Sequence, residues 1–259
     1  MLWKKLKEDN FDTDIIEENK ETLHKEDFTE GLFEKLYDNF PEENKHRLSI
    51  QYRMHPVIGS LISKGFYGNE VQNGTPKEER NIGIDDYNDI AIEWITTSKL
   101  STTKRYEKRV GDETNATYKN NAEISIIKEK LHELDKLASR VIRVGVITAY
   151  RAQKSAIKDM IKQQNFHFLS VEVDTVDAFQ GGQKEVIIYS TVRSSSIANR
   201  IGFLKSEARL NVSLSRAQSL LIIVGDLDFL NNPHIHGNKF PEIIQYINQT
   251  QGCRITEGE

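Results

Sequence analysis

The stretch from Val171 to Arg193, VEVDTVDAFQGGQKEVIIYSTVR, concentrates hydrogen-bonding side chains around a pair of glycines. Carboxylate, hydroxyl, amide and ammonium groups gather there: Asp174, Thr175, Asp177, Gln180, Gln183 and Lys184. Gly181 and Gly182 let the backbone turn, or approach a ligand where a side chain would not fit. In open parallel sheets, polar ligands bind at the carboxyl ends of strands. Spacing alone leaves two interpretations open, a ligand site and a solvated connection between strands.

Two predicted strands hold this polar loop. Val171 and Val173 alternate with charged residues, which indicates a half-buried strand. Residues 185–192 form a nearly continuous β-branched run, typical of a strand buried on both faces. The loop is therefore predicted to be anchored at both ends by a sheet.

Buried strands alternate with amphipathic helices along the rest of the chain. Further strands are predicted at residues 48–52, 91–96, 141–150 and 220–224. Helices are predicted from Pro56, over 120–138, directly after 150, over Arg209–Ala217 and from Pro241. The clearest stripe, with spacings of three and four, consists of Ile124, Ile127, Leu131, Leu134 and Ala138. Residues 69–90 are predicted to be loop. The alternation predicts one domain with a parallel sheet covered by helices on both faces.

Composition is that of a globular protein. The chain has 259 residues, of which 37% are hydrophobic, enough for a sizeable core. No apolar run approaches the roughly 20 residues of a membrane span, so we expect no membrane partner. A single cysteine, Cys253, excludes an internal disulfide and favours the reducing cytoplasm. His234 and His236 lack a neighbouring cysteine or carboxylate, and we predict no metal site within this chain.

Negative charge is concentrated at the start of the chain. Residues 1–30 carry ten acidic residues and five lysines, so their net charge of −5 leaves +1 for residues 31–259. We expect the first segment to form helical pieces lying on the domain or a partly ordered lead-in. Because the body is near neutral, any nucleic-acid groove must be a local feature.

Three motifs resemble those of superfamily 1 helicases and occur in the same order. They are Gln51–Pro56, similar to the motif IV region, Asp174–Arg193, similar to motif V, and Arg209–Ala217, similar to motif VI. The resemblance spans about residues 32–226 and is strongest to the branch that contains the nonsense-mediated-decay RNA helicase and the senataxin-like helicases. It implies that residues 31–259 form the second RecA-like domain of a helicase, after an acidic lead-in over 1–30. Residues 32–36 resemble the family's short helix before motif IV.

The resemblance implies a site for ATP. The family's arginines on the γ-phosphate correspond to Arg53 and Arg216, whose planar, permanent charge suits phosphoryl transfer. We expect Arg209 and Arg216 on one side of a helix. The adenine-stacking aromatic corresponds to Tyr52, and the ribose-binding glutamate is replaced by Gln183. Gly182 replaces the family's arginine beside it, and Gly181 completes the predicted nucleotide-binding set.

The resemblance also implies contacts to the backbone of single-stranded DNA or RNA. The predicted residues are Thr148, Tyr150, Thr175 and Arg193, of which Thr148 and Thr175 offer hydroxyl groups to phosphates. Residues 144–153 are similar to the family's Ile-Thr-Pro-Tyr motif, with Ala149 in place of proline. The basic stretch 99–113 is either a solvated loop or a further contact to the strand. Other departures, in motif VI, are Ala208, Ser213 and Ser215.

Essential parts of an ATPase are missing from this sequence. It contains no Gly-x-x-x-x-Gly-Lys-Ser/Thr phosphate loop and no Asp-Glu pair after a buried strand to hold Mg²⁺. Both are expected on a first RecA-like domain of the same polypeptide, so we predict that this segment alone is inactive. Two functions remain: the C-terminal motor domain of an ATP-dependent helicase, or a RecA-like module that binds nucleic acid or protein without turnover. A self-sufficient nucleotide enzyme is disfavoured.

Overall fold

The computed structural model describes residues 37, 39, 41–45, 48–112, 116–179, 181–197 and 201–259. The chain divides into two compact units, Met1–Leu48 and Ser49–Glu259. In the first unit, the described part includes a short 3-10 helix, η2 (Glu42–Asn44). The predicted lead-in over 1–30 and the short helix over 32–36 lie outside the described residues.

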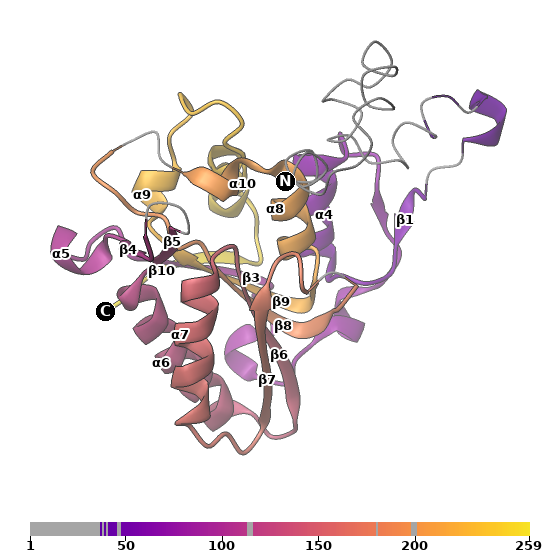
Figure 1. Ribbon diagram of the computed structural model, residues 1–259. Coiled ribbons are helices and arrows are strands. Elements are labelled where there is room, and N and C mark those ends of the chain that lie inside the picture. The colour runs from indigo at the N-terminus through magenta and orange to yellow at the C-terminus, as the bar shows by residue number, and fades with distance from the viewer. Residues whose placement is uncertain are drawn as a thin grey trace, which may run out of the picture. The chain divides into compact units, whose positions relative to one another are not determined.

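Six parallel strands form the central sheet of the second unit (Figure 1). In chain order they are β3 (Ile92–Thr96), β6 (Ile142–Thr148), β7 (Leu169–Thr175), β8 (Lys184–Ser190), β9 (Ala217–Gly225) and β10 (Cys253–Glu257). Their spatial order is β10-β3-β9-β8-β6-β7, and every neighbouring pair is parallel. The predicted parallel sheet is confirmed. The sequence did not indicate β10, which extends the sheet beyond β3 at one edge.

Helices cover both faces of this sheet, as predicted (Figure 1). One face packs against α6 (Asn121–Leu137) and α7 (Arg151–Lys162), and the other against α4 (Pro56–Phe66), α8 (Glu207–Leu214) and α10 (Phe240–Gln249). Alternate residues of β8 pack into the hydrophobic cores on opposite sides of the sheet, because successive side chains of a strand point to opposite faces. Val186 and Ile188 pack on the α6 side, whereas Ile187 and Tyr189 pack on the other. None of the described helices is long and apolar enough to cross a membrane.

Local sequence signals set where the main helices begin. The Asn120 side chain accepts hydrogen bonds from the amides of Ala122 (3.1 Å) and Glu123 (3.3 Å), which caps α6. Helix α4 begins at Pro56, where a missing amide proton has no consequence. Ser206 accepts from the Arg209 amide at 3.4 Å and caps α8.

Smaller elements differ from the predictions. The predicted strand at 48–52 is reduced to β1 (Ile50–Gln51), which pairs with β2 (Gln72–Asn73) outside the main sheet. Residues 77–80 and 85–87 form the 3-10 helices η3 and η4. The predicted loop at 99–113 contains α5 (Thr102–Arg105) and β4 (Lys108–Val110), and β4 pairs antiparallel with β5 (Thr117–Lys119).

The motif VI helix is shorter than predicted. Helix α8 ends at Leu214 with Ser215 as its C-cap, so Arg216 lies between α8 and β9 rather than on a helix face. Ala217 begins β9, where it is the register partner of Lys184 on β8. Pairing with the neighbouring strand therefore ends the helix before Arg216, although the sequence predicted a helix through Ala217.

The connection between β7 and β8 crosses β6, since β6 lies between these two strands. Phe179 of this connection is buried with the core on the α4 side, and it lies over Gly145 of β6. A Cβ atom at residue 145 would lie 2.7 Å from the Phe179 ring and 2.7 Å from Ile187 Cδ1. Gly145 therefore provides the space that the crossing needs.

Replacing Gly145 by alanine should lower the free energy of unfolding by about 1–3 kcal/mol, the usual cost of an overpacked core. Urea unfolding monitored by circular dichroism measures the change. Gly65→Ala is the matched control, because a Cβ there meets nothing within 4 Å and residue 65 lies in α4. This control should stabilise by about 0.5–1 kcal/mol. Equal stability of Gly145→Ala and wild type would contradict the packing argument.

Candidate nucleotide and nucleic-acid sites

The predicted site residues lie at the two opposite ends of the parallel strands. We call the side where the strands end the carboxyl edge, and the side where they begin the amino edge. Thr148 and Thr175 are register partners at the carboxyl ends of β6 and β7. Gln183 and Arg216 directly precede β8 and β9, so they lie at the amino ends of the strands. The predicted nucleic-acid contacts therefore gather at the carboxyl edge and the predicted γ-phosphate arginines at the amino edge.

Backbone carbonyl groups hold Arg216 at the amino edge. Its Nε donates to the carbonyl of Val212 (3.2 Å), and its Nη1 donates to the carbonyl of Gly182 (3.2 Å). The Arg216 carbonyl in turn accepts from the Lys184 amide at 3.1 Å. Arg216 is thus tied to the end of α8 and to the glycine loop of motif V.

Arg53 reaches the same place from the motif IV segment. Its Nη1 donates to the carbonyl of Ser215 at 3.2 Å, directly beside Arg216. Two side chains fix the backbone around it. The Gln51 Oε1 accepts from the Arg53 amide (2.9 Å), and Arg80 donates from Nε to the Arg53 carbonyl (2.8 Å). The structure therefore brings the two predicted arginines together, although the sequence separates them widely.

The two arginines have no acidic partner within 4 Å among the described residues. Arg216 is only 9% exposed, yet every hydrogen bond found for it goes to a neutral carbonyl. Burial, followed by the charge of Arg53, lowers the pKa of Arg216. An anion bound here would relieve this repulsion, so the pair is suited to a phosphate group.

The remaining predicted nucleotide residues are exposed near these arginines. Tyr52, next to Arg53, is 64% exposed, and its ring lies over Gly74, where a Cβ would approach it to 2.3 Å. Gly181 has a φ of 87°, a left-handed conformation that suits glycine. Gln183 is exposed one residue beyond Gly182, whose carbonyl Arg216 binds.

The carboxyl edge places the predicted nucleic-acid residues at different depths. Thr148 is fully buried, and Tyr150 and Arg193 are 3% and 4% exposed. Thr175 is half-buried. Arg193 donates to the Tyr150 hydroxyl at 3.3 Å and forms an ion pair with Glu107 at 3.1 Å. The structure groups these four residues, and their contact with a strand stays a prediction.

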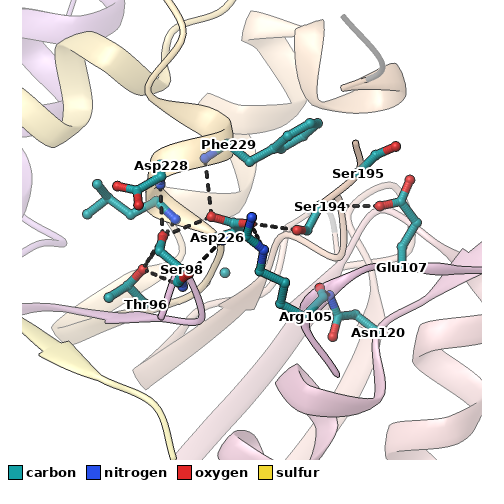
Figure 2. A network of polar contacts seen from close by, with 12 residues as sticks. Thr96, Ser98, Arg105, Glu107, Asn120, Ser194, Ser195, Asp226, Asp228 and Phe229 are labelled. Atoms are coloured by element: carbon teal, nitrogen blue, oxygen red, sulfur yellow. Dashed lines mark hydrogen bonds and ion pairs between the residues drawn. The ribbon is translucent and has the colours of Figure 1, made fainter. Parts of the chain in front are cut away.

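A polar network joins the basic insertion to this edge of the sheet (Figure 2). The Asp226 carboxylate accepts from the hydroxyls of Ser98 (2.8 Å) and Ser194 (2.6 Å), and it lies 3.6 Å from Arg105. Glu107 accepts from the Ser194 amide at 2.7 Å. The network fixes the start of the insertion against the segment that follows β8.

Glu123 of α6 is buried in the core and accepts hydrogen bonds from the residues at the end of β8. Its carboxylate accepts from the Ser190 hydroxyl (2.6 Å), the Thr191 hydroxyl (3.2 Å) and the Val192 amide (2.8 and 2.9 Å). Val192 has a φ of 69°, which is strained for a β-branched residue and costs about 1–3 kcal/mol. Asn120 donates to the Val192 carbonyl at 3.2 Å. These bonds hold the strained residue directly before Arg193.

Glu123, Glu107 and Arg80 were not among the residues predicted from the sequence. One signal was available for Glu123, since it lies four residues before Ile127 on the apolar stripe of α6. A charged residue at a core position must find polar partners. No signal marked Glu107 or Arg80, because their partners come from distant segments.

The comparisons identify the class of protein. The chain matches the AAA domain family over residues 28–228 and belongs to that family. It is 31% identical over 219 residues to Helicase sen1 of Schizosaccharomyces pombe, covering 82% of the chain and 12% of that protein. It is 33% identical over 211 residues to Regulator of nonsense transcripts 1 of Caenorhabditis elegans, covering 78% and 19%.

The chain therefore spans less than a fifth of either relative. The resemblance to superfamily 1 helicases that the three motifs predicted is confirmed by these matches. The C-terminal domain of a possible DNA helicase from Lactobacillus plantarum WCFS1 aligns with a TM-score of 0.40 at 12% identity, over 81% of this chain and 99% of that one.

The buried Glu123 carboxyl group should make the stability of the protein depend on pH. Burial raises the pKa of Glu123 to about 8, above the value of about 4.3 for an unfolded chain. Between these values the folded state binds more protons than the unfolded state, so this contribution is complete below about pH 4 and is lost as pH rises through 8. Glu123→Gln, which stays neutral, should remove this part of the pH dependence.

Chemical unfolding at pH values from 5 to 9 tests this for wild type and Glu123→Gln. The difference in unfolding free energy between them should change steadily up to about pH 8. Glu123→Ala should destabilise at every pH by about 1–3 kcal/mol or more, because the Val192 amide loses its partner. A difference between wild type and Glu123→Gln that is independent of pH would show that Glu123 does not titrate in this range.

Proposed function

We propose that this chain is part of an ATP-dependent superfamily 1 helicase, in which residues 31–259 form the second RecA-like domain. Membership of the AAA domain family, the helicase relatives and the three ordered motifs support this proposal. A phosphate loop and the Mg²⁺ ligands would come from a first RecA-like domain of the same polypeptide. Alone, residues 1–259 would not turn over ATP.

One observation carries the proposal: Arg53 and Arg216 converge at the amino edge without a carboxylate within 4 Å in the described part of the chain. An arginine that serves only to stabilise a fold usually pairs with an acid or solvates its charge. These two are held by carbonyl groups that orient the guanidinium groups and do not neutralise them. That arrangement suits donors to the γ-phosphate, where charge redistributes during transfer.

The other residues of this edge complete a nucleotide site. The exposed ring of Tyr52 would stack on adenine, and the Gln183 amide would bind a ribose hydroxyl beside Gly181. Mg²⁺, held by ligands of the first RecA-like domain, would neutralise phosphate charge. Within this chain, the residues orient the nucleotide and supply positive charge.

Single-stranded DNA or RNA would lie along the carboxyl edge. Thr175 is a half-buried residue next to the buried Thr148, and contacts from its hydroxyl to a phosphate would not depend on sequence. Such contacts suit a motor that translocates along a strand. The amino edge of the sheet would thus bind ATP, and the carboxyl edge would bind the single strand.

Removing either arginine from the full-length protein should lower ATP turnover by about 10³–10⁵-fold, as for other arginines supplied in trans. Arg216→Lys should not restore turnover, because a point charge cannot reproduce the planar fork. The measurement compares nucleic-acid-stimulated ATP hydrolysis and single-strand affinity for Arg53→Ala, Arg216→Ala and Arg216→Lys. Affinity without nucleotide should stay unchanged.

Arg143→Ala is the matched control, since Arg143 is on β6 near the same edge but pairs with Glu185 at 3.5 Å. It should stay within a few-fold of wild-type turnover. If folded Arg53→Ala and Arg216→Ala proteins also stay within a few-fold, the assignment of these arginines fails.

Gln183→Glu in the full-length protein should strengthen ATP binding by roughly 1 kcal/mol, about fivefold in Kd, because a charged acceptor binds a hydroxyl more strongly. Isothermal titration with ATP and with 2′,3′-dideoxy-ATP measures the effect. The gain should vanish for the dideoxy nucleotide, which has no ribose hydroxyl. An equal gain for both nucleotides would mean that residue 183 does not contact the ribose.

A further inference from the structure

Three aromatic rings pack edge to face at the carboxyl edge of the sheet. Tyr118 of β5 lies 5.6 Å from Tyr150, at an interplanar angle of 85°, and Tyr150 lies 5.9 Å from Phe203, at 66°. Tyr150 is 3% exposed, whereas Phe203 is 55% exposed. Tyr150, a predicted nucleic-acid residue, is thus buried beneath Phe203 and supports its ring. The Phe203 ring itself faces solvent.

Phe203 lies in the 3-10 helix η5 (Gly202–Lys205), which is firmly seated. Its neighbours Ile201 and Leu204 are fully buried and 2% exposed, respectively. Gly202 lies directly on the support, because a Cβ there would come within 2.7 Å of Arg193 Nη1 and 2.9 Å of the Tyr150 hydroxyl. The exposed ring therefore projects from a segment whose neighbouring residues are buried in the domain.

One arginine lies beside this ring, and two exposed cations lie close in the sequence to Tyr150 or Phe203. The Arg209 guanidinium lies 5.5 Å from the centre of Phe203, and it pairs with Asp177 at 3.0 Å, which neutralises that acid. Arg151, directly after Tyr150, and Lys205, two residues after Phe203, are exposed and form no ion pair with any described residue. An exposed aromatic ring with an arginine beside it can stack on a nucleobase, and the exposed cations Arg151 and Lys205 can attract the neighbouring phosphates.

We propose that Phe203 stacks on a base of the single-stranded nucleic acid, with Tyr150 and Arg193 positioning its ring from below. This inference rests on the proposed function and names a binding residue that the motifs do not include. The chemistry favours a base over an apolar protein side chain, because a single exposed ring beside an arginine is a small apolar target. It also assigns a role to the buried Tyr150 and Arg193 that needs no direct contact.

Binding of residues 1–259 to two fluorescent strands tests the proposal. One strand is a dT12 oligonucleotide, and the other is an abasic strand of equal length with the same phosphates. Stacking contributes about fivefold to a hundredfold in affinity per base. Phe203→Ala and Phe203→Leu should therefore weaken dT12 binding by that factor, whereas Phe203→Trp should retain it. None of the three should change binding to the abasic strand or the salt dependence of binding.

Phe168→Ala is the matched control, because Phe168 is 38% exposed directly before β7, at the amino edge. It should bind both strands as wild type does. Unchanged dT12 affinity in folded Phe203→Ala, with wild-type protein binding dT12 normally, would overturn the stacking and leave the proposed function standing. Equal losses on both strands would also overturn it, since the ring would then act through the fold. Failure of the wild-type chain to bind dT12 would contradict the nucleic-acid site itself.

Discussion

The segment between β7 and β8 has to cross β6, because the three strands are parallel and β6 lies between the other two. Crossovers between parallel strands usually take about a dozen residues or more. Residues 176–183 suffice here because Gly145 leaves room for Phe179 on the face of β6. Much of the candidate site depends on this short crossing. It starts at Thr175 on the carboxyl edge and ends at Gln183 on the amino edge.

One continuous segment therefore belongs to both edges of the sheet. At the amino edge, the Gly182 carbonyl accepts from Arg216 at 3.2 Å. At the carboxyl edge, the backbone of Thr175 accepts from the Phe179 amide at 2.9 Å, which starts the crossing. Strand β8 then returns to the carboxyl edge, where Glu123 fixes its end. Hydrogen bonds from Arg216 to Gly182, from Gly182 to Phe179 and from Phe179 to Thr175 therefore link the two ends of the strands.

Periodicity in the sequence predicted the buried strands and the long helices, since these repeat over enough residues to be distinct. It failed where a distant partner decides the structure. Strand β10 exists because β3 offers it an edge, and Arg216 leaves the helix because β8 pairs with Ala217. The site followed the same division. The motifs selected Arg53 and Arg216, which the structure brings close together, whereas the hydrogen bond from Arg80 to the Arg53 carbonyl has no local sequence signal.

The motifs did not predict how deeply the nucleic-acid residues are buried. Arg193 and Glu107 pair with side-chain exposures of only 5% and 8%, and the partner comes from an insertion that no motif includes. A buried ion pair adds little net stability, but removing one partner leaves an uncompensated charge. Direct contact with a phosphate would therefore require Arg193 to exchange Glu107 for the new anion. Arg151 and Lys205 would need no such exchange, since they are exposed and form no ion pair with any described residue.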